Sequence, residues 1–234
     1  MKILHKGFNY SQDGPGNRLV YHLQGCNFAC KWCSNADSIP RENSAAKDCD
    51  VEDVFDEIMR SRMMFFDGGG VTFTGGEACL QSEELLPLLR MLRENGINTA
   101  IETNGSLPSL REISEYVDYL IVDFKHYDDE KHIEWVGKSN CSVKENIIFF
   151  LEKGRQIHIR IPVINGVNSD PCGFAEFFGN LNTENAVFEF LAYHEFGKDK
   201  WKGEYKIENG FVDAATIKKF TEKFNSIGLK TVVT

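Results

Sequence analysis

Short runs of β-branched and aromatic residues alternate along the chain with longer stretches whose apolar residues recur at helical spacing. The strand-like runs lie at Leu19–Gln24, Val71–Thr74, Asn98–Thr103, Tyr119–Phe124, Ile157–Pro162 and Val187–Leu191. The amphipathic stretches lie at Val51–Met64, Glu83–Glu94, Leu110–Tyr116, Val143–Glu152, Cys172–Leu181 and Ala214–Phe224. The pattern predicts an α/β protein in which β and α elements alternate, without an internal repeat or a low-complexity run.

Strict alternation of strands and helices predicts a parallel sheet with right-handed crossovers. In barrels and in open α/β sheets, ligands bind beyond the carboxyl ends of the strands. Polar, charged or glycine residues follow or end all of the predicted strands, namely Gly25 and Cys26, residues 75–77, residues 102–105, Asp123 and Lys125, Arg160, and His194. These strand ends are therefore predicted to meet at one site.

Composition and charge narrow the class of protein. The 234 residues predict one domain, residues 1–234, with a core at about 18–191. A hydrophobic content of 42%, a charged content of 26% and 18 phenylalanines are typical of a soluble protein with a well-filled core. A net charge of −9 disfavours nucleic-acid binding. The sequence shows neither a signal peptide nor a membrane-spanning stretch, so we expect a cytoplasmic protein.

Three of the seven cysteines, Cys26, Cys30 and Cys33, lie within eight residues after the first predicted strand. An odd and uneven set of cysteines in a chain of this length argues against a disulfide framework. The CxxxCxxC spacing lets one loop offer thiolates to three corners of an iron–sulfur cluster. A [4Fe–4S] cluster usually takes four cysteines, so three would leave one iron open to a small molecule.

Two other interpretations of these cysteines exist. The first is a zinc site, which would need a fourth ligand such as His22, and the second is three unrelated buried cysteines. Structural zinc ligands usually come as two separated pairs, so the iron–sulfur interpretation is favoured.

The motifs, taken in order, resemble those of the glycyl radical enzyme activases of the radical S-adenosylmethionine (SAM) superfamily, most of all the pyruvate formate-lyase activating group. The matching runs are DGPGNR at 13–18, LQGCN at 23–27, CKWCSN at 30–35, GVTFTGGE at 70–77, ETNG at 102–105, VDFK at 122–125, IRIPV at 159–163 and YHEFGKDKW at 193–201. The likeness extends from about residue 8 to 205.

The resemblance implies a partial (β/α)6 TIM-like barrel and an oxidoreductase activity. Members of this family bind one [4Fe–4S] cluster through three cysteines and reductively cleave SAM to a 5′-deoxyadenosyl radical. That radical abstracts a hydrogen from a backbone glycine of a partner glycyl radical enzyme, with an electron from flavodoxin or a ferredoxin-type donor. The chemistry is anaerobic.

The resemblance also implies SAM contacts. Glu77 would accept from the methionine ammonium, with Gly76 permitting close backbone approach. Lys125 and Arg160 would contact the methionine carboxylate and the ribose, and Asp123 a ribose hydroxyl or a cation. The adenine side would be formed by Trp32, Asn35 and His194. The alternatives are a helix N-terminal acid for Glu77, ordinary ion pairs for the charged residues and a structural role for His194.

Two further sites are implied. Some members bind a monovalent cation, Na⁺ or K⁺, and the corresponding residues are Glu102, Thr103, Asp123 and the carbonyl of Ile121. Glu102 is one methylene longer than the aspartate usual in the family, and it could instead reach the methionine ammonium. Asp13 resembles a residue that contacts the glycine loop of the partner, although an aspartate beside Gly-Pro-Gly also favours a turn by itself.

The sequence departs from the family in ways that leave the partner open. The interval before GGE holds only Cys49, so we expect no ferredoxin-like insert, and Cys79, Cys141 and Cys172 are scattered singly. Ser34 and Ala78 stand where histidine and proline are usual. The competing hypotheses are a radical SAM enzyme acting on a small molecule or peptide, as 7-carboxy-7-deazaguanine synthase does, and a noncatalytic iron–sulfur or zinc protein.

Overall fold

The computed structural model describes residues 1–203 and 205–232. Two compact units make up the chain. Unit 1 comprises residues 1–27, 37–103 and 107–121, and unit 2 comprises residues 28–36, 104–106 and the described residues from 122 onward. Strand β6 (Tyr119–Asp123) contains the boundary between them.

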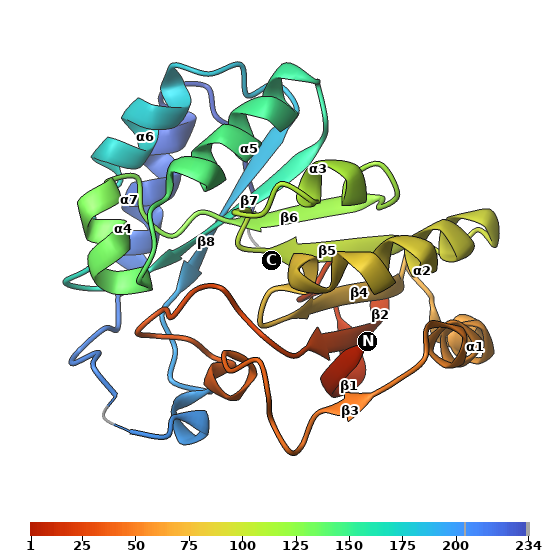
Figure 1. The fold of residues 1–234 in the computed structure, drawn as a ribbon. Coiled ribbons are helices and arrows are strands. Elements are labelled where there is room, and N and C mark those ends of the chain that lie inside the picture. Colours follow the sequence, from red (N-terminus) through yellow and green to blue (C-terminus); the bar gives the residue numbers. More distant parts are fainter. Residues whose placement is uncertain (204, 233–234) are drawn as a thin grey trace. The chain divides into compact units, whose positions relative to one another are not determined.

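Unit 1 holds strands in the order β3-β1-β2-β4-β5 (Figure 1). They are β1 (Lys2–Tyr10), β2 (Asn17–Leu23), β3 (Lys47–Asp48), β4 (Gly70–Gly75) and β5 (Thr99–Thr103). Strands β2, β4 and β5 are parallel, whereas β1 is antiparallel to both β2 and β3. The helices are α1 (Val51–Ser61), α2 (Ser82–Glu94) and α3 (Leu110–Ile113), with short 3-10 helices at Arg62–Met64 and Ala78–Gln81; a further one, Ala36–Ser38, begins in unit 2.

Helix α2 shows how the apolar pattern forms the core of unit 1. Leu85, Leu88, Leu89 and Leu92 recur at helical spacing and are all fully buried. Each buried leucine contributes roughly 1.5–3 kcal/mol relative to an exposed one, so this face fixes the helix beside the sheet.

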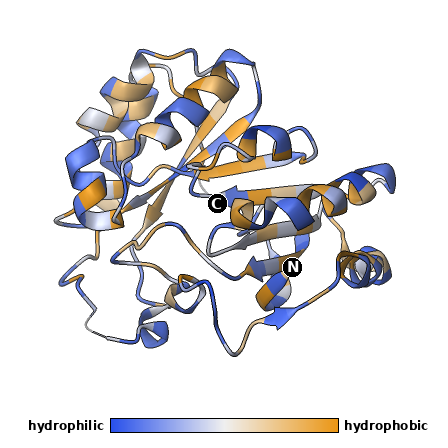
Figure 2. Cartoon of the chain, in the orientation of Figure 1, coloured by the Kyte–Doolittle hydropathy of each residue, from blue (hydrophilic) through white to orange (hydrophobic). Residues whose placement is uncertain are grey.

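Unit 2 pairs β7 (Ile157–Val163), β8 (Ala186–Ala192) and β9 (Thr231–Val232) in parallel. Its helices are α4 (Asp129–Val136), α5 (Cys141–Glu152), α6 (Cys172–Gly179) and α7 (Ala214–Asn225), with a 3-10 turn at Lys198–Lys200. Helix α7 packs against α6 and β8 (Figure 1). Hydrophobic residues run along β7 and β8, and the loops are largely hydrophilic (Figure 2).

The phenylalanines of unit 2 form its core. The fully buried rings are Phe124, Phe150, Phe174, Phe178, Phe188, Phe220 and Phe224. Phe178 of α6 meets Phe188 of β8 edge-on with ring centroids 4.7 Å apart, a geometry that aromatic pairs prefer. The well-filled core expected from the phenylalanine content is therefore confirmed in this unit.

All of the predicted strands and helical stretches are present, with ends that differ by a few residues. The predicted wholly parallel sheet was wrong at one edge, because β1 precedes the first predicted strand and pairs antiparallel to it. Strict alternation also fails where β3 follows β2 and where α5 follows α4. Strands β3 and β9 and helix α4 were also missed. The described residues contain no helix long and apolar enough to cross a membrane.

Candidate active site

The turn after β4 brings two backbones into close contact within unit 1. Gly76 N donates to the carbonyl of Leu23 at 2.9 Å, and Glu77 N donates to the carbonyl of Gly25 at 2.8 Å. A Cβ on Gly76 would lie only 2.1 Å from the oxygen of Gly25. Gly75 has φ +119°, a conformation that favours glycine. The Gly-Gly pair therefore fixes the start of the cysteine loop against the end of β4.

The carboxylate of Glu77 is fully buried. Its Oε1 accepts from the amide of Cys79 at 3.0 Å and from the hydroxyl of Thr103 at 2.7 Å. Glu77 thus caps the 3-10 helix at Ala78–Gln81, the structural alternative considered for it. An ionised carboxylate has several acceptor positions, and an ammonium is among the donors that suit it.

Glu102 and Thr103 end β5. Glu102 Oε2 accepts from the hydroxyl of Thr74 at 2.9 Å, while Thr103 donates to Glu77. Ile121, whose carbonyl was predicted to join them at a cation, lies in β6 and is buried. Oxygen ligands of these kinds suit Na⁺ or K⁺, but each hydroxyl here is engaged with a carboxylate.

Asp13 lies in a turn that a buried arginine holds in place. The Arg18 guanidinium donates to Thr72 Oγ1 at 2.7 Å, to Asn98 Oδ1 at 2.9 Å and to the carbonyl of Pro15 at 3.1 Å. Thr72 in turn donates to the carbonyl of Asp13 at 2.7 Å, and the Asp13 carboxylate accepts from Asn9. Burial lowers the pKa of Arg18 to about 10, so it stays charged at neutral pH.

The remaining cysteines of the motif lie on a loop of unit 2 that helix α4 holds. Ala29 N donates to the carbonyl of Val136 at 2.9 Å, and Lys31 N to that of Trp135 at 3.0 Å. Cys30 is buried and Cys33 is half-buried. Helix α4 was missed in the sequence, although its ends carry clear signals: Asp128 caps its first turn, and Gly137 ends it at φ +84°.

Trp32, predicted to pack beside the adenine, is 8% exposed. Asn35, predicted on the same side, accepts at its Oδ1 from Lys200 Nζ at 2.7 Å. His194 is exposed and stacks on the ring of Phe196 with centroids 4.5 Å apart. Partial desolvation lowers the pKa of His194, so its imidazole is neutral at pH 7 and available for hydrogen bonding.

Asp123 and Lys125 form an ion pair at the end of β6. Lys125 Nζ donates to Asp123 Oδ2 at 2.9 Å, and the lysine is 9% exposed. Burial alone would lower the pKa of Lys125, but the Asp123 carboxylate and the sulfurs of Cys30 and Cys33 together raise it. A lysine cation beside these sulfurs favours the thiolate forms that a cluster requires.

Arg160 in β7 is 7% exposed and pairs with Glu189 of β8, which is 2% exposed. Sequence reasoning missed Glu189. A glutamate inside the apolar run Val187–Leu191 signals a buried charged partner, since such residues are almost never buried alone. His158 Nε2 lies 3.0 Å from the same carboxylate oxygen, Glu189 Oε2.

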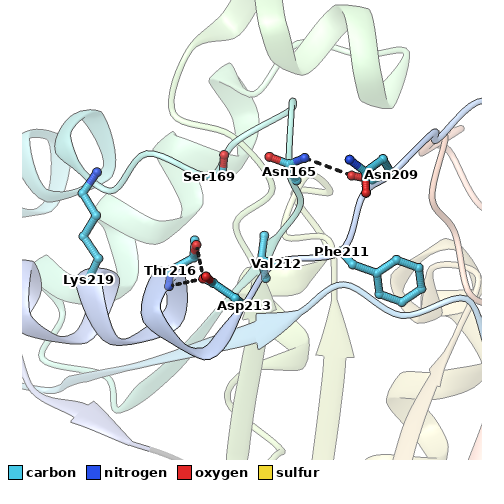
Figure 3. Close-up of a pocket in the computed structure, with 8 residues that line it drawn as sticks. All are labelled: Asn165, Ser169, Asn209, Phe211, Val212, Asp213, Thr216 and Lys219. Carbon is cyan, nitrogen blue, oxygen red and sulfur yellow. Dashed lines mark hydrogen bonds between the residues drawn. The ribbon is translucent and has the colours of Figure 1, made fainter.

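A cavity of about 340 Å³ lies elsewhere in unit 2, beside the start of α7 (Figure 3). It is lined by Asn165, Ser169, Asn209, Phe211, Val212, Asp213, Thr216 and Lys219. Two pairs of these residues bond to each other: Asn165 donates to the carbonyl of Asn209 at 3.0 Å, and Thr216 donates to Asp213 (Figure 3). No predicted site residue is among the described residues that line it.

The predicted site residues divide between the units. Unit 1 holds Asp13, Cys26, Gly76, Glu77, Glu102, Thr103 and Ile121, and unit 2 holds Cys30, Trp32, Cys33, Asn35, Asp123, Lys125, Arg160 and His194. Among residues 1–203 and 205–232, no three His, Cys, Asp or Glu side chains are gathered as a metal site would gather them. The fit of a cluster therefore rests on the donors, three thiols within eight residues, two of them beside a lysine cation.

Comparison with known proteins gives a consistent result. The profile of the Radical SAM superfamily matches residues 20–178. The chain is 35% identical over 207 residues to pyruvate formate-lyase 1-activating enzyme of Escherichia coli (strain K12), covering 84% of this chain and 83% of the relative. It is 32% identical to pyruvate formate-lyase-activating enzyme of Staphylococcus epidermidis, covering 84% of each.

Solved structures agree. A domain of pyruvate-formate lyase-activating enzyme from Bacteroides vulgatus matches with TM-score 0.60 and 27% identity, covering 71% of this chain and 99% of that one. QueE from Escherichia coli matches with TM-score 0.61 over 100% of this chain and 93% of its own, but at 16% identity this shows the fold alone.

The chain belongs to the radical SAM superfamily, and the α/β fold class expected for it is confirmed. It is accordingly an enzyme that uses a [4Fe–4S] cluster and S-adenosylmethionine. Within the superfamily, its similarity is to pyruvate formate-lyase activating enzymes.

Proposed function

We propose that this protein is a glycyl radical enzyme activase. The observation that carries the proposal is the similarity to pyruvate formate-lyase activating enzymes, at 35% identity over 84% of this chain. The profile match at 20–178 runs through both compact units, which supports treating residues 1–234 as one radical SAM domain.

When bound, the cluster supplies the electron that splits the C5′–S bond of SAM into methionine and a 5′-deoxyadenosyl radical. We assign Cys26, Cys30 and Cys33 as its protein ligands. The glycine Cα of the partner would lose one hydrogen atom to the adenosyl group, so the products would be 5′-deoxyadenosine and a glycyl radical.

The remaining assignments concern SAM. Glu77, in its buried cap position, would accept from the methionine ammonium. Lys125 and Arg160 are cations held by carboxylates, suited to the methionine carboxylate and the ribose, with Asp123 beside them. The adenine side would be formed by Trp32, Asn35 and His194, and Gly76 would permit close approach of the backbone to the ligand.

A monovalent cation, Na⁺ or K⁺, would bind at Glu102, Thr103, Asp123 and the carbonyl of Ile121. Asp13 would meet the glycine loop of the partner. We further propose flavodoxin or a ferredoxin-type protein as the electron donor and the cytoplasm as the compartment, since flavodoxin-type carriers are found there.

The small-molecule alternative has weaker support. The likeness to QueE is one of fold at 16% identity, whereas the likeness to the activases extends through the sequence at about twice that identity. The noncatalytic alternative would need a fourth protein ligand for a closed cluster or zinc site.

The test has two steps. Anaerobically reconstituted protein, given reductant and SAM, is expected to form 5′-deoxyadenosine, and a Cys30→Ala variant is expected to form none. Cys141→Ala is the matched control, because Cys141 is exposed and lies outside the motif. Addition of a glycyl radical enzyme from the same organism should then produce a glycyl radical signal in electron paramagnetic resonance. Absence of 5′-deoxyadenosine from the wild type would refute the SAM chemistry; its formation without any glycyl radical would refute the choice of partner.

A further inference from the structure

A segment far along the chain closes on the cysteine loop within unit 2. It consists of Gly197, Lys200 and Trp201, at the ends of the 3-10 turn Lys198–Lys200. We call these three residues the clasp. Each touches a different residue of the loop, although about 165 positions separate them in sequence.

Trp201 contacts the backbone of a proposed cluster ligand. Its indole Nε1 donates to the carbonyl of Cys33 at 3.0 Å. The amide of Cys33 donates to the carbonyl of Cys30 at 3.1 Å, so both polar backbone groups of Cys33 are satisfied. With its peptide groups fixed, the Cα–Cβ bond of Cys33 points in one direction, and the sulfur takes one of the staggered positions about that bond.

Lys200 contacts a proposed adenine-side residue. Its ammonium donates to Asn35 Oδ1 at 2.7 Å. A hydrogen bond from a charged donor is stronger than one between neutral groups, so the interaction favours one orientation of the Asn35 amide.

Gly197 makes the approach possible. A Cβ on this residue would lie 2.1 Å from the carbonyl oxygen of Ser34, which no side chain could accommodate without a backbone shift. Its φ of −99° is open to any residue. The glycine is therefore required by contact with the loop and not by its own backbone conformation.

From these contacts we infer that Gly197, Lys200 and Trp201 are positioning residues, which hold Cys33 and Asn35 in place for the cluster and the nucleoside. The inference rests on the proposed roles of Cys33 and Asn35. The clasp belongs to the run Tyr193–Trp201, which also carries His194, so one segment would order the loop and present an adenine contact.

The first test uses the metal-free protein, in which the loop is already bonded to the clasp. Gly197→Ala, Trp201→Phe and Lys200→Met should each speed hydrogen exchange in a peptide covering residues 29–35 by about tenfold, the loss expected for one such hydrogen bond. Three matched controls should leave that exchange unchanged. Gly7→Ala adds a methyl group where nothing lies within 4 Å, Tyr205→Phe removes a hydroxyl bonded to Tyr193, and Lys202→Met removes an exposed neighbouring lysine.

The second test uses the reconstituted protein. Trp201→Phe should release iron to a chelator about tenfold faster than wild type, and Lys200→Met should weaken SAM binding about tenfold with a smaller change in rate at saturating SAM. The inference would be overturned if the clasp variants exchanged amide hydrogens and released iron at the same rates as the wild type. Failure of the wild type itself to take up iron would instead refute the proposed function, and the exchange experiment would still decide whether the clasp orders the loop.

Discussion

The Nε of Arg160 donates to Oε2 of Glu189 at 2.7 Å, between two side chains that are 7% and 2% exposed. The two residues are register partners in the parallel strands β7 and β8. His158, two residues before Arg160, points the same way and lies 3.0 Å from the same oxygen. Burial raises the pKa of Glu189, but His158 and Arg160 outweigh that effect and hold its pKa below the usual value of 4.5.

Glu189→Gln is therefore expected to destabilise the metal-free protein by about 2 kcal/mol at pH 7, because it removes the charge opposite a buried guanidinium. The folded-state pKa of Glu189 is lowered, so its contribution is complete above about pH 4.5 and is lost as pH falls through the folded value. Urea denaturation of both proteins between pH 7 and pH 3 should show their difference shrinking only below pH 4.5.

Glu152→Gln supplies the control, since Glu152 is exposed at the end of α5. Equal stability of Glu189→Gln and Glu152→Gln at pH 7 would mean that the buried pair contributes nothing. If Glu189→Gln weakened SAM binding without lowering stability, the main role of Glu189 would be to orient Arg160.

Gly76→Ala is expected to lower stability by about 2 kcal/mol, since its Cβ would collide with the carbonyl of Gly25. Thermal unfolding of the metal-free protein measures this effect. The same change at Gly7 should shift the melting temperature far less, because the space there is open. Equal melting temperatures of the Gly76→Ala and Gly7→Ala variants would show that stability does not depend on the close approach of the two backbones.

The free cysteines should differ in reactivity. Cys79 is buried, and burial together with the nearby Glu77 carboxylate raises its pKa well above the usual value. Cys141 and Cys172 are exposed. Iodoacetamide at pH 8 should alkylate these two at least about a hundredfold faster than Cys79 in the folded metal-free protein, as mapped by mass spectrometry. Equal rates would contradict the burial of Cys79, and unfolding in urea should remove the difference.

Arg18→Lys should cost about 3 kcal/mol despite keeping the charge. A lysine cannot reach Thr72, Asn98 and the carbonyls of Val71 and Pro15 together, as the planar guanidinium does. Arg62→Lys, on the exposed surface, should be neutral. Urea denaturation gives the free energy of unfolding of both variants. A decrease below 1 kcal/mol in Arg18→Lys would show that stability does not depend on the hydrogen-bond network.

The sequence predicted the strands well where the pattern was unambiguous. The run Ile157–Pro162 alternates three buried isoleucines with His158 and Arg160, and this period of two is typical of a strand. Strand β1 was missed because its middle, His5 to Gly7, is polar or lacks a side chain and is exposed. Helix α4 was missed because it is eight residues long and buries only His132 and Val136.

The site was predictable to the extent that its residues lie in local motifs. Cys26, Cys30 and Cys33 were found by spacing, and Glu77 by its Gly-Gly neighbours. The partners that orient such residues come from elsewhere in the chain. Glu189 contacts Arg160 because their strands pair in register, and Lys200 contacts Asn35 because a later loop folds back on the cysteine loop. Neither contact can be predicted from the spacing of residues along the sequence.

The bonds between the cysteine loop and helix α4 also affect how readily a cluster there would accept an electron. Hydrogen bonds from backbone N–H groups to cluster sulfurs raise the reduction potential. The amides of Ala29, Lys31 and Cys33 already donate to the carbonyls of Val136, Trp135 and Cys30. With these donors engaged elsewhere, the negative charge gained on reduction receives less compensation. These three amides would therefore add nothing to the reduction potential of a cluster bound at the loop.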